Sequence, residues 1–367
     1  KYLDGKFAKK NPAVAEANKL AIAAGYNYAA NTHQFANNYT VAPAPREKGT
    51  YRSINGNVAT AWGLCAAAEK AGLPLFCGSY PITPATVILE ELAKRKDLGV
   101  KTVQAEDEIA GICTAIGAAF AGNFAVTTTS GPGLSLKSEA LGLAVMTELP
   151  LVVVDVQRGG PSTGLPTKTE QSDLAQALYG RNGECPVIVV AASSPSDCFH
   201  YAFEAGRLAM EHMTPVVLLT DGFIASGSEP WRIPSMKDYP AIQPPIIDEA
   251  PEGGFMPYVR NEKLARGWAF PGKVGLEHRV GGLEKDCVKG CISHDPANHQ
   301  KMTRTRAEKV AKVAEDIPAQ SVYGDAEGDL LVVGWGGTRG HLQNAVDEMR
   351  KEGKKVSLCH FNYINPL

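Results

Sequence analysis

Apolar segments alternate with helical segments along the middle of the chain. The apolar segments lack a polar–apolar alternation, which is typical of parallel strands buried on both faces. We predict strands at 73–80, 101–106, 124–130, 149–158, 186–193 and 215–226. Apolar residues at helical spacing predict helices at 55–72, 84–95, 107–122, 135–148, 170–180 and 195–213. The sequence therefore predicts an α/β fold with a doubly wound parallel sheet.

The flanking segments divide the chain further. An Ala-rich helix is expected over 11–28, ending at Gly25. Polar residues with Pro43 and Pro45 then have linker composition. A Pro- and Gly-rich stretch follows the predicted sheet. A β-α-β pattern then restarts near the end of the chain. The sequence looks truncated at both its first and its last residues. The expected units are 1–30, the end of a preceding domain; 31–54, a linker; 55–235, the main α/β domain; 236–305, a long connection; and 306–367, the start of a second α/β domain.

Composition and charge exclude several classes of protein. The 367 residues are 44% hydrophobic and 21% charged, close to average globular usage. A net charge of −2 argues against a large nucleic-acid surface or a polybasic membrane patch. Neither a transmembrane segment nor a signal peptide is visible, so we expect a cytoplasmic protein that binds neither nucleic acid nor membrane.

The eight cysteines do not form a metal-binding motif. No Cys-x-x-Cys occurs, and the closest pair is Cys287 and Cys291. Four ligands at zinc or iron–sulfur spacing are missing, so we expect reduced thiols and no metal site in this chain. A metal centre, if the protein handles electrons, would then lie on another chain.

The stretch "SYPITPAT" follows the first predicted strand of the sheet. Each proline fixes its own φ and disfavours the α region for the residue before it. Tyr80 and Thr83 are therefore expected on a stiff loop at the carboxyl end of a strand. Ligands bind at that edge in open α/β sheets. The loop is thus a candidate binding element with one exposed hydroxyl, that of Thr83.

Glu106, in "QAEDEIAG", ends the next predicted strand. Asp107 and Glu108 complement the dipole of the helix that follows, but this structural explanation suits Glu106 less well. A carboxylate at a strand end can hydrogen-bond or protonate a ring nitrogen. Partial burial, which we expect here, would raise its pKa for that task.

Two further polar stretches come from the same predicted edge. "TTTSGPGLS" places Ser130, Gly131, Pro132 and Gly133 between a strand and a helix, where glycines allow a ligand to approach the backbone; a purely structural turn would look much the same. Arg158 ends the most apolar strand, and a guanidinium is the natural bidentate partner of a carboxylate, although strand-end arginines are often only solvated. Four polar groups at one edge favour a binding site there.

The segment "GWGGTRG" imitates a dinucleotide fingerprint. Its glycines at 334, 336 and 340 are spaced one residue too widely at the end, and an approximate match of this kind is weak. We interpret it as a tight turn between a strand and a helix.

Taken in order, "SYPITPAT", "QAEDEIAG", "TTTSGPG" and "QRGGPSTGLPTKTEQSDL" resemble the α subunit of the 2-oxoacid:ferredoxin oxidoreductases. The resemblance runs from about residue 56 to the end, and residues 1–30 resemble the end of the γ domain that one branch of the family carries ahead of α. It implies a pyrimidine-binding domain of thiamine-diphosphate enzymes, followed by a domain like the C-terminal one of transketolase.

The resemblance also implies roles for individual residues. Glu106 would contact N1′ of the aminopyrimidine as the catalytic carboxylate, and Thr83, Tyr80 and Arg158 would bind the 2-oxoacid. The Ser130–Gly131–Pro132–Gly133 turn would help to bind the cofactor. "GGPSTGLPT" is most similar to the 2-oxoglutarate branch.

The resemblance further implies a β subunit that carries Mg²⁺ and a [4Fe-4S] cluster, with coenzyme A as co-substrate, ferredoxin as electron acceptor and an (αβ)₂ assembly. Three alternatives remain at this stage. They are a non-oxidative thiamine-diphosphate decarboxylase or synthase α chain, an NAD(P)-dependent dehydrogenase, and a non-catalytic scaffold subunit.

Overall fold

The computed structural model describes residues 1–35, 37 and 39–367. The chain divides into two compact units, Lys1–Gly49 and Thr50–Leu367. The expected linker at 31–54 includes Ala36 and Asn38, which lie outside the described residues, and the predicted domain boundaries stay predictions. None of the described helices combines the length and the apolarity needed to cross a bilayer.

The first unit is helical. It contains η1 (Asp4–Ala8) and α1 (Pro12–Thr32), and the Asn11 side chain caps α1 by accepting a hydrogen bond from the Val14 amide. The predicted end at Gly25 is wrong: α1 runs through Gly25 and ends at His33, which takes the left-handed conformation with φ 50°. Helix propensity of the flanking alanines outweighs the cost of one interior glycine.

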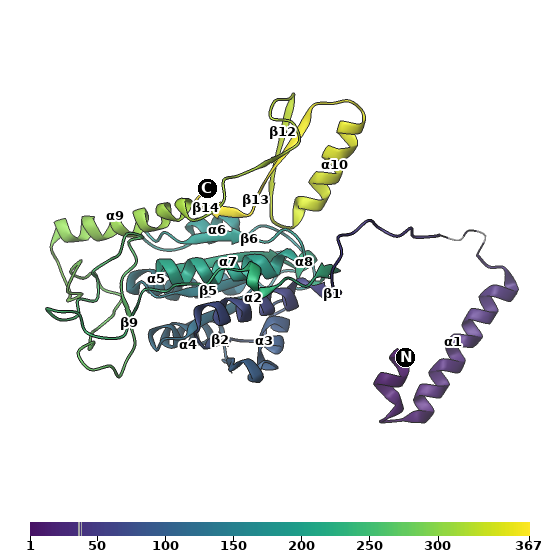
Figure 1. Cartoon of the computed structure of the whole chain (residues 1–367), viewed down its shortest axis with the longest axis horizontal. Helices are drawn as coiled ribbons and strands as arrows, with labels where there is room; N and C mark the ends of the chain where they lie inside the picture. Colours follow the sequence, from purple (N-terminus) through teal and green to yellow (C-terminus); the bar gives the residue numbers. More distant parts are fainter. Residues whose placement is uncertain (36, 38) are drawn as a thin grey trace. The chain divides into compact units, whose positions relative to one another are not determined.

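The second unit is built on a seven-stranded sheet (Figure 1). The strand order is β14-β6-β7-β5-β4-β2-β3, and every pairing except that of β14 is parallel. The prediction of a doubly wound parallel sheet is confirmed. The strands are β2 (Leu75–Ser79), β3 (Lys101–Gln104), β4 (Phe124–Thr129), β5 (Leu151–Gln157), β6 (Ile188–Ala191), β7 (Pro215–Asp221) and β14 (Tyr363–Asn365).

Helices cover both faces of this sheet. All seven residues of β5 are buried, and alternate side chains enter opposite cores: Val152 and Val154 one, Val153 the other. One face packs against α2 (Gly56–Ala71), α3 (Thr86–Ala93) and α7 (Asp197–His212). The opposite face packs against α4 (Glu108–Phe120), α5 (Gly131–Thr147) and α6 (Leu174–Tyr179).

Local capping explains where several elements begin and end. Asn55 accepts a hydrogen bond from the Val58 amide at the start of α2, and Gly72 ends this helix at φ 65°, as its sequence predicts. The predicted strand at 215–226 is wrong in its second half. The Asp221 side chain accepts hydrogen bonds from two following amides and starts the short helix α8 (Gly222–Ser226).

The last part of the chain forms a small sheet and then returns to the large one. The small sheet has the order β11-β13-β12 and is covered by α10 (Arg339–Lys351). Its strands are β11 (Val322–Tyr323), β12 (Leu330–Trp335) and β13 (Val356–Phe361). β14 then pairs antiparallel with β6, which the sequence did not predict (Figure 1).

The "GWGGTRG" segment is the turn expected between β12 and α10, with η5 at Gly336–Thr338. A Cβ at Gly337 would overlap the Asp221 carboxylate, and one at Gly336 would crowd the Gln171 side chain. Close packing against the large domain thus accounts for both glycines, without a dinucleotide.

The remaining elements are short, apart from α9. They are β1 (Tyr51–Asn55), η2 (Lys96–Leu98), β8 (Ser228–Arg232), η3 (Met236–Asp238), β9 (Ile246–Ile247), β10 (Trp268–Ala269), α9 (Pro296–Lys312) and η4 (Val313–Glu315). β1 pairs with β8, and β9 pairs with β10. α9 starts at Pro296 because the Asp295 side chain caps it by accepting hydrogen bonds from the amides of Ala297 and Asn298.

A buried ion cluster fixes the long connection and α9 to the sheet domain. Glu148, 1% exposed, follows α5 and pairs with Lys309 of α9 at 2.5 Å and with Arg260 of the connection. Burial by itself raises the pKa of Glu148, but the Lys309 ammonium and the Arg260 guanidinium outweigh it and lower that pKa to about 2.

Replacement of Glu148 by Gln is expected to destabilise the protein by about 3–5 kcal/mol, because two buried cations lose their anion. Since the folded pKa of Glu148 lies below its ordinary value of 4.5, its contribution is present above pH 4.5 and is lost as the pH falls toward about 2. Denaturant unfolding of both proteins across this range measures the difference. Glu315→Gln, which breaks the exposed pair with Lys312, should cost less than about 1 kcal/mol and serves as the control. A Glu148→Gln protein as stable as this control would contradict the assigned anchoring.

Candidate active site

The strand order creates a crevice at the carboxyl edge of the sheet. The chain leaves β2 for the outer strand β3 and then returns to β4 on the other side of β2. The loops after β2 and β4 therefore diverge at a topological switch point, where ligands bind in this type of fold. The first of these loops carries Tyr80 and Thr83, and the second carries the Ser130–Gly133 turn.

Arg158 joins the loops at this edge. Its side chain is buried, and Nη1 donates a hydrogen bond to the Thr83 carbonyl at 2.5 Å while Nη2 donates to the Thr163 carbonyl at 3.0 Å. Within the described residues its Nε has no partner. The structure thus brings Arg158 and Thr83 together, as predicted, and leaves the Thr83 residue exposed. One N–H of the guanidinium is therefore unsatisfied within the described chain.

A cavity of about 410 Å³ lies beside Arg158. Its wall includes Gly131, Pro132, Arg158, Ser162, Glu170 and Asp173. Three of the predicted site residues therefore meet at one cavity. Its volume suits a small metabolite or part of a larger ligand.

The glycines of the Gly-Pro-Gly turn are also required by packing within the chain. A Cβ at Gly133 would overlap the Thr129 and Tyr80 hydroxyls, and a Cβ at Gly131 would lie 2.5 Å from an Asp173 carboxylate oxygen. Ser130 precedes α5, and its Oγ is buried without a partner among the described residues. Gly131 and Pro132 reach the cavity, whereas Gly133 faces inward.

Tyr80 points into the protein. It is 7% exposed, and its hydroxyl lies 3.3 Å from Thr129 Oγ1. Burial and the hydrogen bond with Glu108 raise its pKa well above the ordinary value. In this chain Tyr80 ties the proline loop to the end of β4, and its substrate contact stays a prediction.

Lys137 of α5 is a buried residue that the sequence analysis missed. Its Nζ donates hydrogen bonds to the Glu108 carbonyl at 2.7 Å and to Thr127 Oγ1 at 3.1 Å, and it lies 5.2 Å from the centre of the Tyr80 ring. Burial lowers its pKa to about 8. The signal was its position: Lys137 stands in helical register with the apolar residues Leu134 and Leu141.

Glu106 lies at the same edge but apart from Arg158. It follows β3, which is three strand spacings from β5, or roughly 14 Å at about 4.8 Å per spacing. The expectation of partial burial is wrong for this chain alone, because Glu106 is exposed. No described residue hydrogen-bonds its carboxylate. The group is therefore free to accept a hydrogen bond from a ligand at the switch point.

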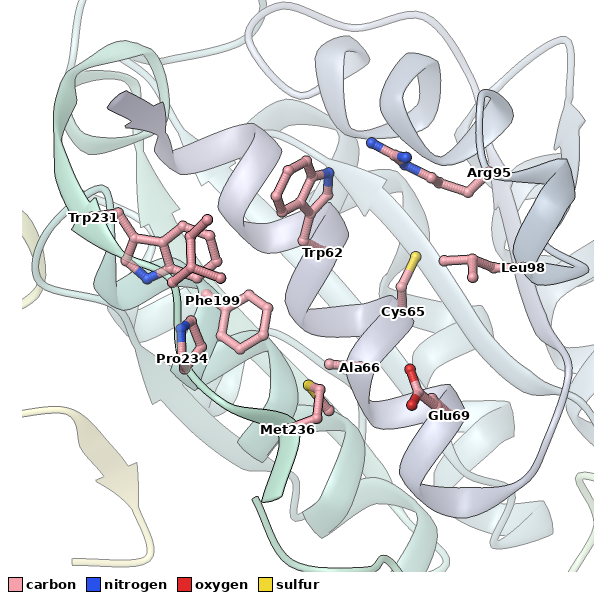
Figure 2. A pocket seen from close by; sticks show the side chains of 11 residues that line it. Trp62, Cys65, Ala66, Glu69, Arg95, Leu98, Phe199, Trp231, Pro234 and Met236 are labelled. Carbon is pink, nitrogen blue, oxygen red and sulfur yellow. The ribbon is translucent and has the colours of Figure 1, made fainter. Parts of the chain in front are cut away.

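A second cavity, of about 280 Å³, lies outside this edge (Figure 2). Figure 2 shows Trp62 and Cys65 on one wall and Phe199 and Trp231 on the other. The Trp62 indole donates a hydrogen bond to Glu91, whose carboxylate also pairs with Arg95. None of the predicted site residues lines this mainly apolar cavity, so the candidate site remains the edge beside Arg158.

Comparisons with known proteins identify the family of this chain. The family described as pyruvate flavodoxin/ferredoxin oxidoreductase, thiamine-diphosphate-binding, matches residues 67–292. The chain is 54% identical over all 367 residues to the 2-oxoglutarate oxidoreductase subunit KorA of Mycobacterium tuberculosis, of which it spans 55%. It is 36% identical over 310 residues to the 2-oxoglutarate synthase subunit KorA of Methanothermobacter marburgensis, covering 84% of this chain and 80% of that protein.

A solved structure is similar over the whole chain. It is the 2-oxoglutarate:ferredoxin oxidoreductase from Magnetococcus marinus with 2-oxoglutarate, coenzyme A and succinyl-CoA bound, at 36% identity and a TM-score of 0.89. The match covers 100% of this chain and 62% of that one. On these grounds the chain belongs to the pyruvate:flavodoxin/ferredoxin oxidoreductase family and contains its thiamine-diphosphate-binding domain.

Proposed function

We propose that this chain is the α-type part of a 2-oxoacid:ferredoxin oxidoreductase that converts 2-oxoglutarate and coenzyme A to succinyl-CoA, CO₂ and reduced ferredoxin. Arg158 carries the proposal: a buried guanidinium with a free Nε beside a cavity at the carboxyl edge suits the carboxylate of a 2-oxoacid. The names of the relatives and the ligands of the Magnetococcus enzyme support 2-oxoglutarate as the substrate.

The residues at the edge fit thiamine diphosphate. Glu106 offers an exposed carboxylate that nothing in the described chain engages, which suits a hydrogen bond to N1′ of the aminopyrimidine. Gly131 and Pro132 line the cavity beside Arg158, and the hydroxyl of the preceding Ser130 is buried without a partner among the described residues. When bound, the cofactor supplies the nucleophile and the electron sink that decarboxylation of a 2-oxoacid needs.

The roles of this chain's residues follow from their positions. Arg158 binds and orients the substrate carboxylate, and the same guanidinium holds the Thr83 carbonyl and so fixes the backbone of the loop that carries the exposed Thr83 side chain. A preformed loop orders the substrate at little entropic cost. Glu106 holds a proton at the pyrimidine nitrogen, and Lys137 secures the start of α4 next to it through the Glu108 carbonyl.

The remaining components belong to partners in this proposal. A β subunit would supply Mg²⁺, the [4Fe-4S] cluster and the other half of the cofactor site, and the assembly would be (αβ)₂ in the cytoplasm. Two findings support a partner: the relatives are named as subunits, and Glu106 is exposed in the single chain.

Co-expressed with its β subunit, the full-length protein is expected to reduce ferredoxin when 2-oxoglutarate and coenzyme A are both present. Initial rates with 2-oxoglutarate, pyruvate, 2-oxobutyrate and oxaloacetate would rank the substrates by kcat/KM. The visible spectrum of the complex would check the cluster. A colourless complex that releases CO₂ without coenzyme A or an electron acceptor would instead indicate a non-oxidative decarboxylase.

Replacement of Glu106 by Gln is expected to lower kcat by about 100-fold or more while changing KM little, because the amide cannot exchange a proton with the ring. Steady-state kinetics of the αβ complex measure both constants. Glu90→Gln, at another exposed glutamate, is the matched control and should retain the wild-type kcat. Near-normal turnover of the Glu106 variant would refute its catalytic role.

A further inference from the structure

Asp155 is an unexplained carboxyl group in the centre of the sheet. It lies on β5, fully buried, between Thr129 of β4 and Leu219 of β7. Neither carboxyl oxygen accepts a hydrogen bond from an N–H or hydroxyl group of the described chain. An isolated ionised carboxylate at such a position would be prohibitively costly. The group must therefore be neutral or share its charge with a neighbour.

That neighbour is Asp173. Its amide donates to the side chain of Gln157, two residues from Asp155 on β5, one of its carboxyl oxygens is also buried without a partner among the described residues, and its carboxyl group is within hydrogen-bonding reach of Asp155. Asp173 lies 9% exposed at the wall of the cavity beside Arg158 and directly against Gly131 in the first turn of α5. A helix N-terminus favours a negative charge there. Asp173 is thus the suitable member of the pair to be ionised, and Asp155 the member to hold a proton.

We propose that Asp155 and Asp173 share one proton, with the Asp155 hydroxyl donating to the Asp173 carboxylate, and that Asp155 is thereby a positioning residue for the substrate cavity. Two carboxylates in contact inside a protein cannot both ionise at moderate cost. In the described chain, no Lys, Arg or His forms an ion pair with either group. The role of the proton in substrate binding rests on the proposed function; the shared proton itself does not.

Burial and the neighbouring carboxyl group both raise the pKa of Asp155, as a shared proton requires. Burial first, and then Asp173, raise the pKa of Asp155 well above its ordinary value. Burial raises the pKa of Asp173 as well, and Glu170 adds to this, while the hydrogen bond from Asp155 acts in the opposite sense. The pair therefore holds a proton to a higher pH than an isolated aspartate would.

Asp173 connects the pair to the loop that forms the cavity. Its amide donates a hydrogen bond to Gln157 Oε1 at 3.2 Å, and Gln157 Nε2 in turn donates to the Thr220 carbonyl at 3.0 Å. The loop that begins at Arg158 thus returns to the sheet at Asp173. Loss of the proton would set two carboxylates against each other here and add a negative charge to a cavity that already contains Glu170. Both effects oppose binding of an anionic substrate.

Infrared spectroscopy tests the proton directly. In the αβ complex labelled with ¹³C at the aspartate carboxyl group, we expect a carboxylic-acid C=O band at about pH 8 that disappears in Asp155→Asn and persists in Asp97→Asn, an exposed control. Absence of this band from the wild-type complex would overturn the proposal. An alkaline titration of the wild-type band gives the same answer should the variant fail to fold.

Kinetics test the positioning role. The KM for 2-oxoglutarate should rise in the wild type over the pH range in which the infrared band disappears, but stay constant over that range in Asp155→Asn, whose amide donates to Asp173 at every pH. Asp155→Ala, without a donor, should raise KM about tenfold throughout. Parallel pH profiles for the wild type and Asp155→Asn would refute the positioning role. An infrared band without any 2-oxoacid activity would refute the proposed function and leave the shared proton intact.

Discussion

The guanidinium of Arg158 is the contact on which the candidate site depends. By donating to the carbonyls of Thr83 and Thr163, it joins the loop after β2 to the loop after β5 across the intervening strand β4. Charged donors give stronger hydrogen bonds than neutral ones, and burial protects them from competing water. The same group would bind the substrate, so the site's architecture and its affinity for anions rest on one side chain.

The sheet could be predicted because its signals are local. Unbroken apolar runs such as "LVVVDVQ" and caps such as Asn55 and Gly72 each determine an element within a few residues. β14 was missed because it depends on a distant partner, the edge of β6. Residues 222–226 were predicted as strand although the adjacent Asp221 caps them as a helix, because the apolar run continues past the cap. Gly25 does not end α1, because a glycine ends a helix only where its backbone turns left-handed, and here His33 takes that conformation.

The site was predicted in part for the same reason. Strand-end positions placed Thr83, Arg158 and the Gly-Pro-Gly turn on one edge, and the meeting of Arg158, Gly131 and Pro132 at a cavity follows from the strand order. Burial could not be predicted so well: Glu106 proved exposed, whereas Tyr80 and Lys137 are buried. Side-chain burial depends on packing between helices, which the local sequence pattern does not encode. Asp155 could not be identified from the sequence, because it lies within the most apolar predicted strand, where a single acidic residue among valines forms no pattern.

The pairing of β14 with β6 has a consequence for how the chain tolerates interruption. β6 would otherwise be the edge strand of the large sheet, with unpaired amides and carbonyls able to recruit a strand from another molecule. Tyr363 and Asn365 occupy that edge from within the same polypeptide. Cleavage of the chain between the small and the large sheet could therefore free β14 from β6. The exposed edge of β6 would then favour self-association of the protein.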